Sequence, residues 1–135
     1  MGSLKLFGIA LVAVVIIDYI WLGFIAKDYY IRSYGDLART VNGEFKPQIW
    51  AAVIVYFLLA LGVTQFVIPL TTEASFLGTF LKGAFLGLII YGVYDMTAMA
   101  VLRDWPLGNS IVDMIWGSFL CGTVTLITKT AQEYI

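Results

Sequence analysis

The chain has 135 residues, of which 61% are hydrophobic and 13% are charged, whereas soluble domains carry about 25% charged residues. This composition indicates one integral membrane domain, residues 1–135, with a formal net charge of −1 that gives no basic surface for nucleic acid. With one cysteine, Cys121, and no histidine, the sequence excludes disulfides within the chain, the usual zinc ligand sets and histidine catalysis.

The first apolar run covers residues 4–26, which is enough for a helix to cross about 30 Å of hydrocarbon at about 1.5 Å per residue. A cleaved signal peptide is the alternative interpretation. The run is longer than the apolar core of a signal peptide, contains Asp18 and Trp21, and has no small-residue cleavage site after it. We therefore expect this segment to remain in the mature protein as the first membrane helix.

Residues 27–46 form the longest polar stretch of the chain, with charged residues placed between tyrosines. Tyrosines and long cationic side chains are typical of the headgroup level, so we expect a long loop at the membrane surface. The next apolar run, residues 47–68, starts at Pro47, and proline is tolerated in the first turn of a helix. This run is the second predicted span.

Two more spans follow, at residues 76–102 and 107–128, and only residues 103–106 separate them. So short a connection predicts a tight antiparallel helical hairpin. The predicted fold is therefore all-α, a bundle of four transmembrane helices with both termini on one face of the membrane, here called face A. The long loop and the short turn lie on the opposite side, face B, whose small excess of lysine and arginine favours the cytoplasm.

Three aspartates, Asp18, Asp95 and Asp113, lie inside predicted spans. Each is six to eight residues from the face B end of its helix, which corresponds to a depth of about 9–12 Å. Ionisable side chains inside a membrane are costly and commonly mark a binding or proton-transfer site. Four aromatic residues are expected near the same depth: Tyr56, Tyr94, Trp21 and Trp116.

Small residues share helical faces with two of these aspartates. Residues recur every four positions in two stripes: Gly83, Gly87, Tyr91 and Asp95 in the third span, and Asp113, Gly117 and Cys121 in the fourth. Such small-residue patterns let helix backbones approach closely, and we expect a seam inside the bundle rather than a dimer interface. The carboxyl groups would then face the interior of the bundle and not the lipid.

The aspartate layer supports a binding hypothesis. A polar pocket open toward face B would bind a proton, a cation or a small cationic solute, with Asp95 as the principal group and Asp18 and Asp113 as its coupled partners. The same three carboxylates are suitable oxygen ligands for a hard metal cation. The pocket would be walled by aromatic residues: Tyr56, Tyr91, Tyr94, Trp21 and Trp116. Lys27 and Arg103 are the basic residues near enough to pair with the acids.

Three alternatives remain open. The aspartates are structural if Asp18 bonds to Trp116, or Asp113 to Trp21, and these bonds only fix the bundle. A lipid-modifying enzyme would use aspartate and tyrosine as acid and base at headgroup depth and would need a pocket open sideways to the bilayer. A non-catalytic accessory subunit, in a homo-oligomer or a larger membrane complex, needs no chemistry at all. No motif implies a cofactor.

Three motifs give the chain a family resemblance. They are Asp18-x-x-Trp21-Leu22-Gly23 followed by Ala26-Lys27-Asp28, Tyr91-x-x-Tyr94-Asp95-Met96-Thr97 leading to Trp105-Pro106-Leu107, and Val112-Asp113-x-x-Trp116-Gly117. In these motifs the sequence resembles a bacterial inner-membrane family catalogued as domain of unknown function 2177, over nearly its whole length. The resemblance implies a four-helix protein of the bacterial inner membrane, and it implies no particular activity, substrate or catalytic residue.

Overall fold

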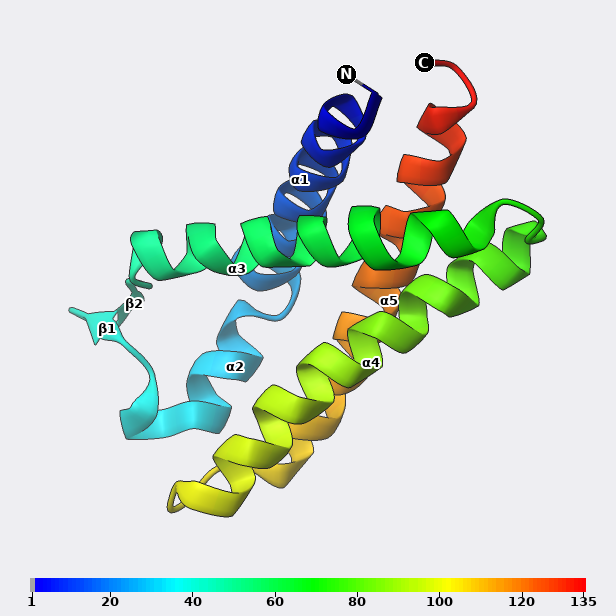
Figure 1. Ribbon diagram of the computed structural model, residues 1–135. Coiled ribbons are helices and arrows are strands. Elements are labelled where there is room, and N and C mark those ends of the chain that lie inside the picture. Colours follow the sequence, from blue (N-terminus) through cyan, green and yellow to red (C-terminus); the bar gives the residue numbers. More distant parts are fainter. Residues whose placement is uncertain (1) are drawn as a thin grey trace.

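The computed structural model describes residues 2–135, and helices make up most of it (Figure 1). Four helical segments are long and apolar enough to cross a membrane: Gly2–Ile25, Ile49–Thr71, Phe76–Val101 and Leu107–Gln132. The prediction of an all-α fold with four membrane helices is confirmed. The outer ends of the first and last segments lie at the same end of the bundle (Figure 1).

The first segment changes geometry beside Asp18. The helix α1 (Gly2–Ile20) passes into one turn of π-helix, η1 (Trp21–Ile25), and Ala26 then leaves helical geometry with φ −111° and ψ 3°. A second helix, α2 (Lys27–Tyr34), starts immediately afterwards. π-Helical turns are rare and are frequent near functional sites because they turn the following side chains to a new face. Here the kink redirects α2 along the bundle.

The stretch expected to be a surface loop therefore contains regular structure. After α2 come a 3₁₀ turn, η2 (Gly35–Leu37), and a hairpin of two short strands, β1 (Thr40–Val41) and β2 (Glu44–Phe45). The Asn42-Gly43 turn has φ of 53° and 79°, the positive values that a tight two-residue hairpin turn requires and that these two residue types tolerate best. The hairpin leads directly into the second membrane segment.

The second segment crosses the bundle at a steep angle in Figure 1. It consists of α3 (Ile49–Gly62), a π-helical turn η3 (Val63–Val67) and a 3₁₀ turn η4 (Ile68–Thr71). The helix α3 packs on α1, and at its last residue a side chain on Gly62 would meet Leu86 and Ile90 of the third segment. From that point its first half diverges from the third segment (Figure 1).

The last two helices, α4 (Phe76–Val101) and α5 (Leu107–Gln132), form the closest-packed pair. A Cβ atom on Gly87 would overlap the backbone of Gly117, and one on Gly83 would lie 2.6 Å from the carbonyl oxygen of Cys121. The two backbones thus touch along the predicted glycine stripe, as small residues permit. The stripe is an internal seam, as expected, and does not face outward.

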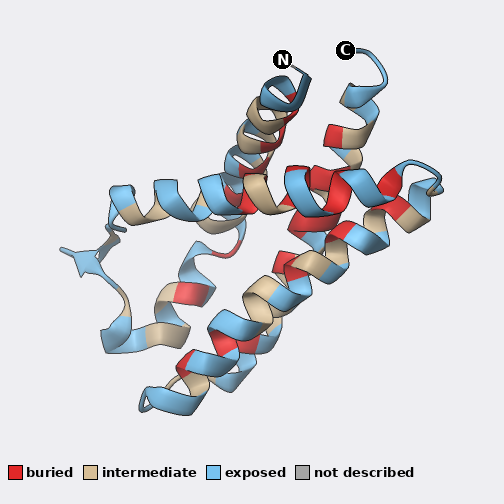
Figure 2. Cartoon of the chain, in the orientation of Figure 1, coloured by how far each residue is buried: buried red, intermediate tan, exposed pale blue. Residues whose placement is uncertain are grey.

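Buried residues concentrate where α1, the second segment and α5 meet (Figure 2). This apolar core includes Val14 of α1, Leu59 and Val63 of the second segment, and Leu120 of α5. The outward sides of the helices carry exposed large apolar residues, which suits contact with lipid. The core lies toward the end of the bundle that holds the chain termini, and it leaves the other end free for polar groups.

Candidate functional site

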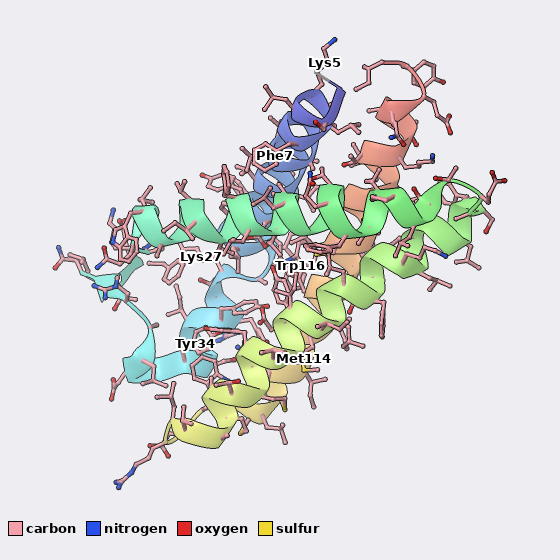
Figure 3. All side chains as sticks on the ribbon, viewed as in Figure 1. Lys5, Phe7, Lys27, Tyr34, Met114 and Trp116 are labelled. Atoms are coloured by element: carbon pink, nitrogen blue, oxygen red, sulfur yellow. The ribbon has the colours of Figure 1, made fainter. Side chains whose placement is uncertain are left out.

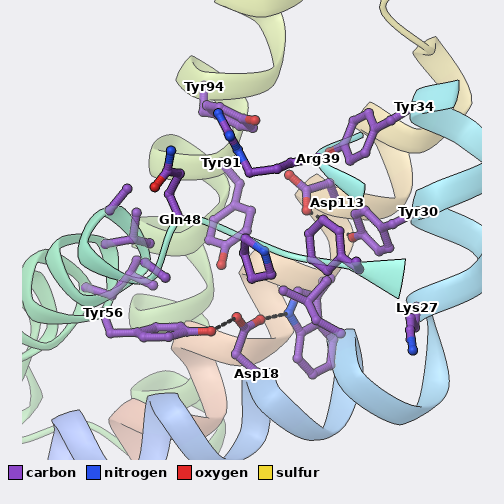
Figure 4. Close-up of a pocket in the computed structure, with 18 of the residues that line it drawn as sticks. Asp18, Lys27, Tyr30, Tyr34, Arg39, Gln48, Tyr56, Tyr91, Tyr94 and Asp113 are labelled. Atoms are coloured by element: carbon purple, nitrogen blue, oxygen red, sulfur yellow. Dashed lines mark hydrogen bonds between the residues drawn. The ribbon is translucent and has the colours of Figure 1, made fainter. Parts of the chain in front are cut away.

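A cavity of about 560 Å³ lies where α3 diverges from α4 (Figure 4). Small-molecule sites typically measure about 300–1,000 Å³. Most of its wall is apolar, and its polar and aromatic lining residues are Asp18, Lys27, Tyr30, Tyr34, Arg39, Gln48, Tyr56, Tyr91, Tyr94, Asp113 and Trp116. The lining comes from all four membrane segments, from α2 and from the linker that follows it.

Asp18 connects three helices at the inner end of this cavity. Its carboxylate accepts a hydrogen bond of 2.7 Å from the Tyr56 hydroxyl and one of 2.9 Å from Nε1 of Trp116. The Asp18 side chain is 5% exposed, and both hydrogen bonds are partly buried. The bond between Asp18 and Trp116 was one of the two interhelical pairs expected from the sequence, and it joins α1 to α5 (Figure 3 shows Trp116 in the middle of the bundle).

Asp113 is held from α2 by a residue that sequence analysis missed. The Tyr30 hydroxyl donates a hydrogen bond of 2.9 Å to Oδ1 of Asp113, and Nε1 of Trp21 donates to the Tyr30 oxygen at 3.3 Å. Trp21 therefore reaches Asp113 through Tyr30, whereas the expected bond was direct. Burial and the nearby Asp113 raise the pKa of Tyr30 above its ordinary value, so this phenol keeps its proton and remains a donor.

Tyr30 and Tyr34 had been grouped with the interfacial residues of the expected loop. They lie four residues apart on α2, which places both on one helical face. That face turns inward: Tyr30 is buried, and the rings of Tyr34 and Trp105 have centroids 5.2 Å apart. Burial and the neighbouring Tyr94 raise the pKa of Tyr34 too. The four-residue spacing of these tyrosines was the signal that could have identified them as inward-facing.

Asp95 does not line the cavity, in contrast to its expected place as the principal pocket group. It is fully buried between α4 and α5, and within the part of the chain that the structure describes neither of its carboxyl oxygens makes a hydrogen bond. The reason is its helical face, because Asp95 continues the stripe of Gly83 and Gly87 that packs on α5. The aspartate layer is thus divided, with two acids at the cavity and one behind it.

Four of the five aromatic residues expected in the pocket wall line the cavity, and the fifth packs behind one of them. Tyr56, Tyr91, Tyr94 and Trp116 line the cavity, whereas Trp21 does not. Trp21 stacks on Trp116 instead, with ring centroids 4.4 Å apart and planes inclined by 8°. It supports the wall from behind, while Figure 4 shows Tyr56, Tyr91 and Tyr94 facing Tyr30 and Tyr34 across the cavity.

No basic residue neutralises the aspartates within residues 2–135. The ion pair that the structure forms there joins Lys46 to Glu44 at 3.5 Å, at the surface. Lys27 lines the cavity without pairing to an acid, and Arg103 lies exposed in the turn between α4 and α5. Both had been candidates for pairing with the acids. Arg39, which also lines the cavity, is exposed and forms no ion pair among the described residues.

The three aspartates do not form a metal centre of the kind considered from the sequence. Among residues 2–135 no group of three or more aspartate, glutamate, histidine or cysteine side chains is placed to hold a metal ion. Asp18 uses both carboxylate oxygens as acceptors for Tyr56 and Trp116, and Asp95 lies behind the cavity. A hard cation shared by all three carboxylates is therefore not supported.

The cavity offers negative charge at its inner end and aromatic surface along its walls. A cation near an aromatic face gains about 0.5–2 kcal/mol, more when it is removed from water. The two cavity carboxylates, on Asp18 and Asp113, are 5% and 8% exposed and pair with no basic side chain among residues 2–135. This combination suits a positively charged group carried on an apolar body.

Comparison with known proteins places the sequence among membrane proteins. Residues 3–130 match the model of a family described as predicted membrane protein (DUF2177). No curated protein and no solved structure matches the chain.

Proposed function

The chain belongs to the DUF2177 family of predicted membrane proteins, and from this membership and the geometry of the cavity we propose that it binds a small amphiphilic cation within the membrane. The ligand is an organic ammonium with an apolar body. Its charge lies near Asp113 and Asp18, and its apolar part lies against the aromatic and aliphatic wall. The membrane that we propose is the inner membrane of a bacterium.

One observation carries the proposal: two buried carboxylates line an aromatic cavity, and within the described part of the chain neither forms an ion pair with a basic residue. A carboxylate in a membrane is costly unless a proton, a cation or hydrogen-bond donors compensate its charge. Asp18 has two donors, whereas one oxygen of Asp113 accepts a bond from Tyr30. Asp113 is therefore the acid with the greater remaining capacity to hold a ligand's charge.

Lys27 and Arg39 do not cancel this negative charge. Both side chains are exposed, so solvent screens their effect on the buried carboxylates. At headgroup level they also suit lipid phosphate groups, which lie outside the site. We infer that they border the entrance of the cavity while the acids define its inner end.

The position of α3 beside the cavity indicates how the ligand would enter. Residues of α3 and of α4 both line the cavity, and we propose that a membrane-dissolved amphiphile enters between these two helices from the bilayer. The same route of entry favours a second candidate, a lipid-modifying enzyme, because such an enzyme needs a pocket that opens sideways to the bilayer. In that case Asp113 and Tyr30 would act on a lipid headgroup as acid and base, and incubation with phospholipid would yield a new lipid product.

The test is equilibrium binding by the purified protein in lipid nanodiscs. Phenethylammonium serves as the cation, and the uncharged 2-phenylethanol serves as a ligand of similar shape. We expect the cation to bind more tightly, and Asp113→Asn to weaken it about ten- to hundredfold, because a charge-assisted hydrogen bond contributes about 1.5–3 kcal/mol. Affinity for 2-phenylethanol should not change.

The matched control is Asp104→Asn, which removes an exposed carboxylate in the turn between α4 and α5. Asp104 has φ of 59°, a conformation that asparagine tolerates as well as aspartate. Equal affinity for the charged and the uncharged ligand, or equal loss in both variants, would reject the proposal. An accessory subunit without chemistry would bind neither ligand in the cavity.

A further inference from the structure

A second polar cluster lies behind the cavity, between α4 and α5. The contacts of Gly87 with Gly117 and of Gly83 with Cys121 define an antiparallel register. Continued toward the turn, that register places Asp95 of α4 opposite Asn109 of α5. A Cβ atom on Gly87 would also meet Cys121, and one on Gly83 would also meet Thr125, so each of these positions packs on two successive turns of α5. For Asp95 the second of these turns carries Asp113, and the buried Ser110 directly follows Asn109. The cluster therefore consists of two carboxyl groups, one amide and one hydroxyl.

Four buried polar atoms in this cluster have no hydrogen-bond partner among the residues that the structure describes. They are both carboxyl oxygens of Asp95 and both polar atoms of the Asn109 amide. Asp95 is 0% exposed and Asn109 is 1% exposed, so bulk water does not reach them. Buried polar groups without a partner are uncommon and costly, and a bound species that satisfies them is one of the explanations for their presence in a native structure.

The charges around Asp95 define what that species must be. From α5 it faces the acid Asp113, to which Tyr30 of α2 donates, while Tyr34 of α2 and Tyr94 of α4 contribute only phenols. The exposed Arg39 lines the cavity, and it forms no ion pair with either acid in the described chain. Two adjacent carboxylates repel each other strongly in a medium of low dielectric constant, and holding one proton removes that repulsion.

We propose that Asp95 and Asp113 hold one proton between them and form a proton-binding site that faces the cavity through Asp113. A proton needs no space beyond the two carboxyl groups. Oδ1 of Asp113 accepts the hydrogen bond of Tyr30, and both of these residues line the cavity, whereas Asp95 does not. Asn109 can donate to the carboxylate that remains ionised.

The site also predicts that release of the shared proton is coupled to binding of the cation in the cavity. This step alone rests on the proposed function. A cation beside Asp113 favours the ionised form of that carboxylate, so the shared proton leaves to water as the cation binds. One positive charge replaces another, and the charge of the cluster stays constant. Binding of the cation should therefore weaken as the pH falls, because protons compete for the same pair of acids.

Infrared spectroscopy of the protein in nanodiscs tests the shared proton without any ligand. The carbonyl stretch of a protonated carboxyl group should appear in the wild-type minus Asp95→Asn difference spectrum, and Asp104→Asn should leave the band intact. In Asp113→Asn the band should change frequency, since the proton loses its carboxylate acceptor. Absence of the band from the wild-type difference spectrum, or an unshifted band in Asp113→Asn, would overturn the shared proton.

Calorimetry tests the coupling separately. Phenethylammonium is titrated into the protein in two buffers with different enthalpies of ionisation, which reports the protons released on binding. The wild-type protein should release protons and Asp95→Asn should release none while still binding the cation. Binding without proton release by the wild type would overturn the coupling. If the cation does not bind at all, the proposed function fails, whereas the infrared result still decides the proton site.

Discussion

Tyr30 donates a hydrogen bond of 2.9 Å to Asp113 across 83 residues of sequence. This bond attaches α2, the short helix after the kink at η1, to the first half of α5. It fixes one wall of the cavity and one of its two acids at the same time. The structural role of Tyr30 and the binding role proposed for Asp113 can therefore be tested with different substitutions.

Replacing Tyr30 by phenylalanine should destabilise the protein without changing the shape of the ring. The substitution removes the donor to Asp113 and the acceptor for Trp21. Interhelical hydrogen bonds in membranes contribute about 0.6 kcal/mol on average and about 1.7 kcal/mol at most, so a loss of about 1–2 kcal/mol is expected for the two bonds. Unfolding in mixed micelles with increasing SDS measures this loss.

Tyr29→Phe is the control for that measurement. Tyr29 is the adjacent residue, lies at the exposed side of α2 and makes no side-chain hydrogen bond within the described chain. The control should keep wild-type stability. Similar unfolding curves for the two variants would show that the Tyr30 bond does not hold α2 in place.

The two donors to Asp18 should be energetically coupled. Tyr56→Phe and Trp116→Phe each remove one hydrogen bond from the same carboxylate. Each bond contributes about 0.6 kcal/mol, and their effects should not add because the carboxylate left with one donor becomes harder to bury. A double-mutant cycle of unfolding free energies measures the coupling. Tyr19→Phe, at an exposed neighbouring position, should have no effect, and strictly additive losses would contradict the coupling.

Adding a methyl group to Gly87 should disrupt the pair formed by α4 and α5. The added Cβ would overlap the backbone of Gly117, which cannot move as a flexible side chain would. Overpacking of this kind costs about 1–3 kcal/mol. Gly8→Ala, on α1 with no atom within 4 Å of the new Cβ, should be neutral or slightly stabilising. A stable Gly87→Ala protein would show that the two backbones are farther apart.

Filling the cavity should abolish ligand binding and leave the fold intact. Ala52 of α3 lines the cavity, and Ala52→Phe places a ring inside it. The next residue, Val53, is 57% exposed on the outer side, so Val53→Phe adds the same ring toward the lipid. Binding of phenethylammonium should be lost only in Ala52→Phe. Retained binding there would place the ligand outside the cavity.

The sequence predicts the membrane helices and their internal seam because both depend on local pattern. Apolar runs of sufficient length define the four spans, and the four-residue repeat of Gly83 and Gly87 identifies the face that packs on α5. The bond between Asp18 and Trp116 follows from polar residues that have few partners inside a bundle. These features can be predicted without knowing the angles at which the helices cross.

The features that sequence analysis missed depend on helix direction. Tyr30 turns inward because a π-helical turn and Ala26 redirect the chain, and a polar aromatic stretch does not reveal such a kink. Asp95 lies behind the cavity because its stripe packs on α5, whereas Ile90 and Tyr94, on another side of α4, line the cavity. A stripe shows that a side chain faces the bundle, but it does not show which neighbour lies there.

The central claim is that a cation occupies the cavity with its charge beside Asp113. An experimental structure determined with 4-bromophenethylammonium tests it most directly, because the bromine marks the position and direction of the ligand. We predict that the ammonium group lies within hydrogen-bonding distance of the Asp113 carboxylate and that the bromine atom lies between α3 and α4. Bromine density only on the outer surface of the helices, or an ammonium group directed away from both cavity acids, would contradict it.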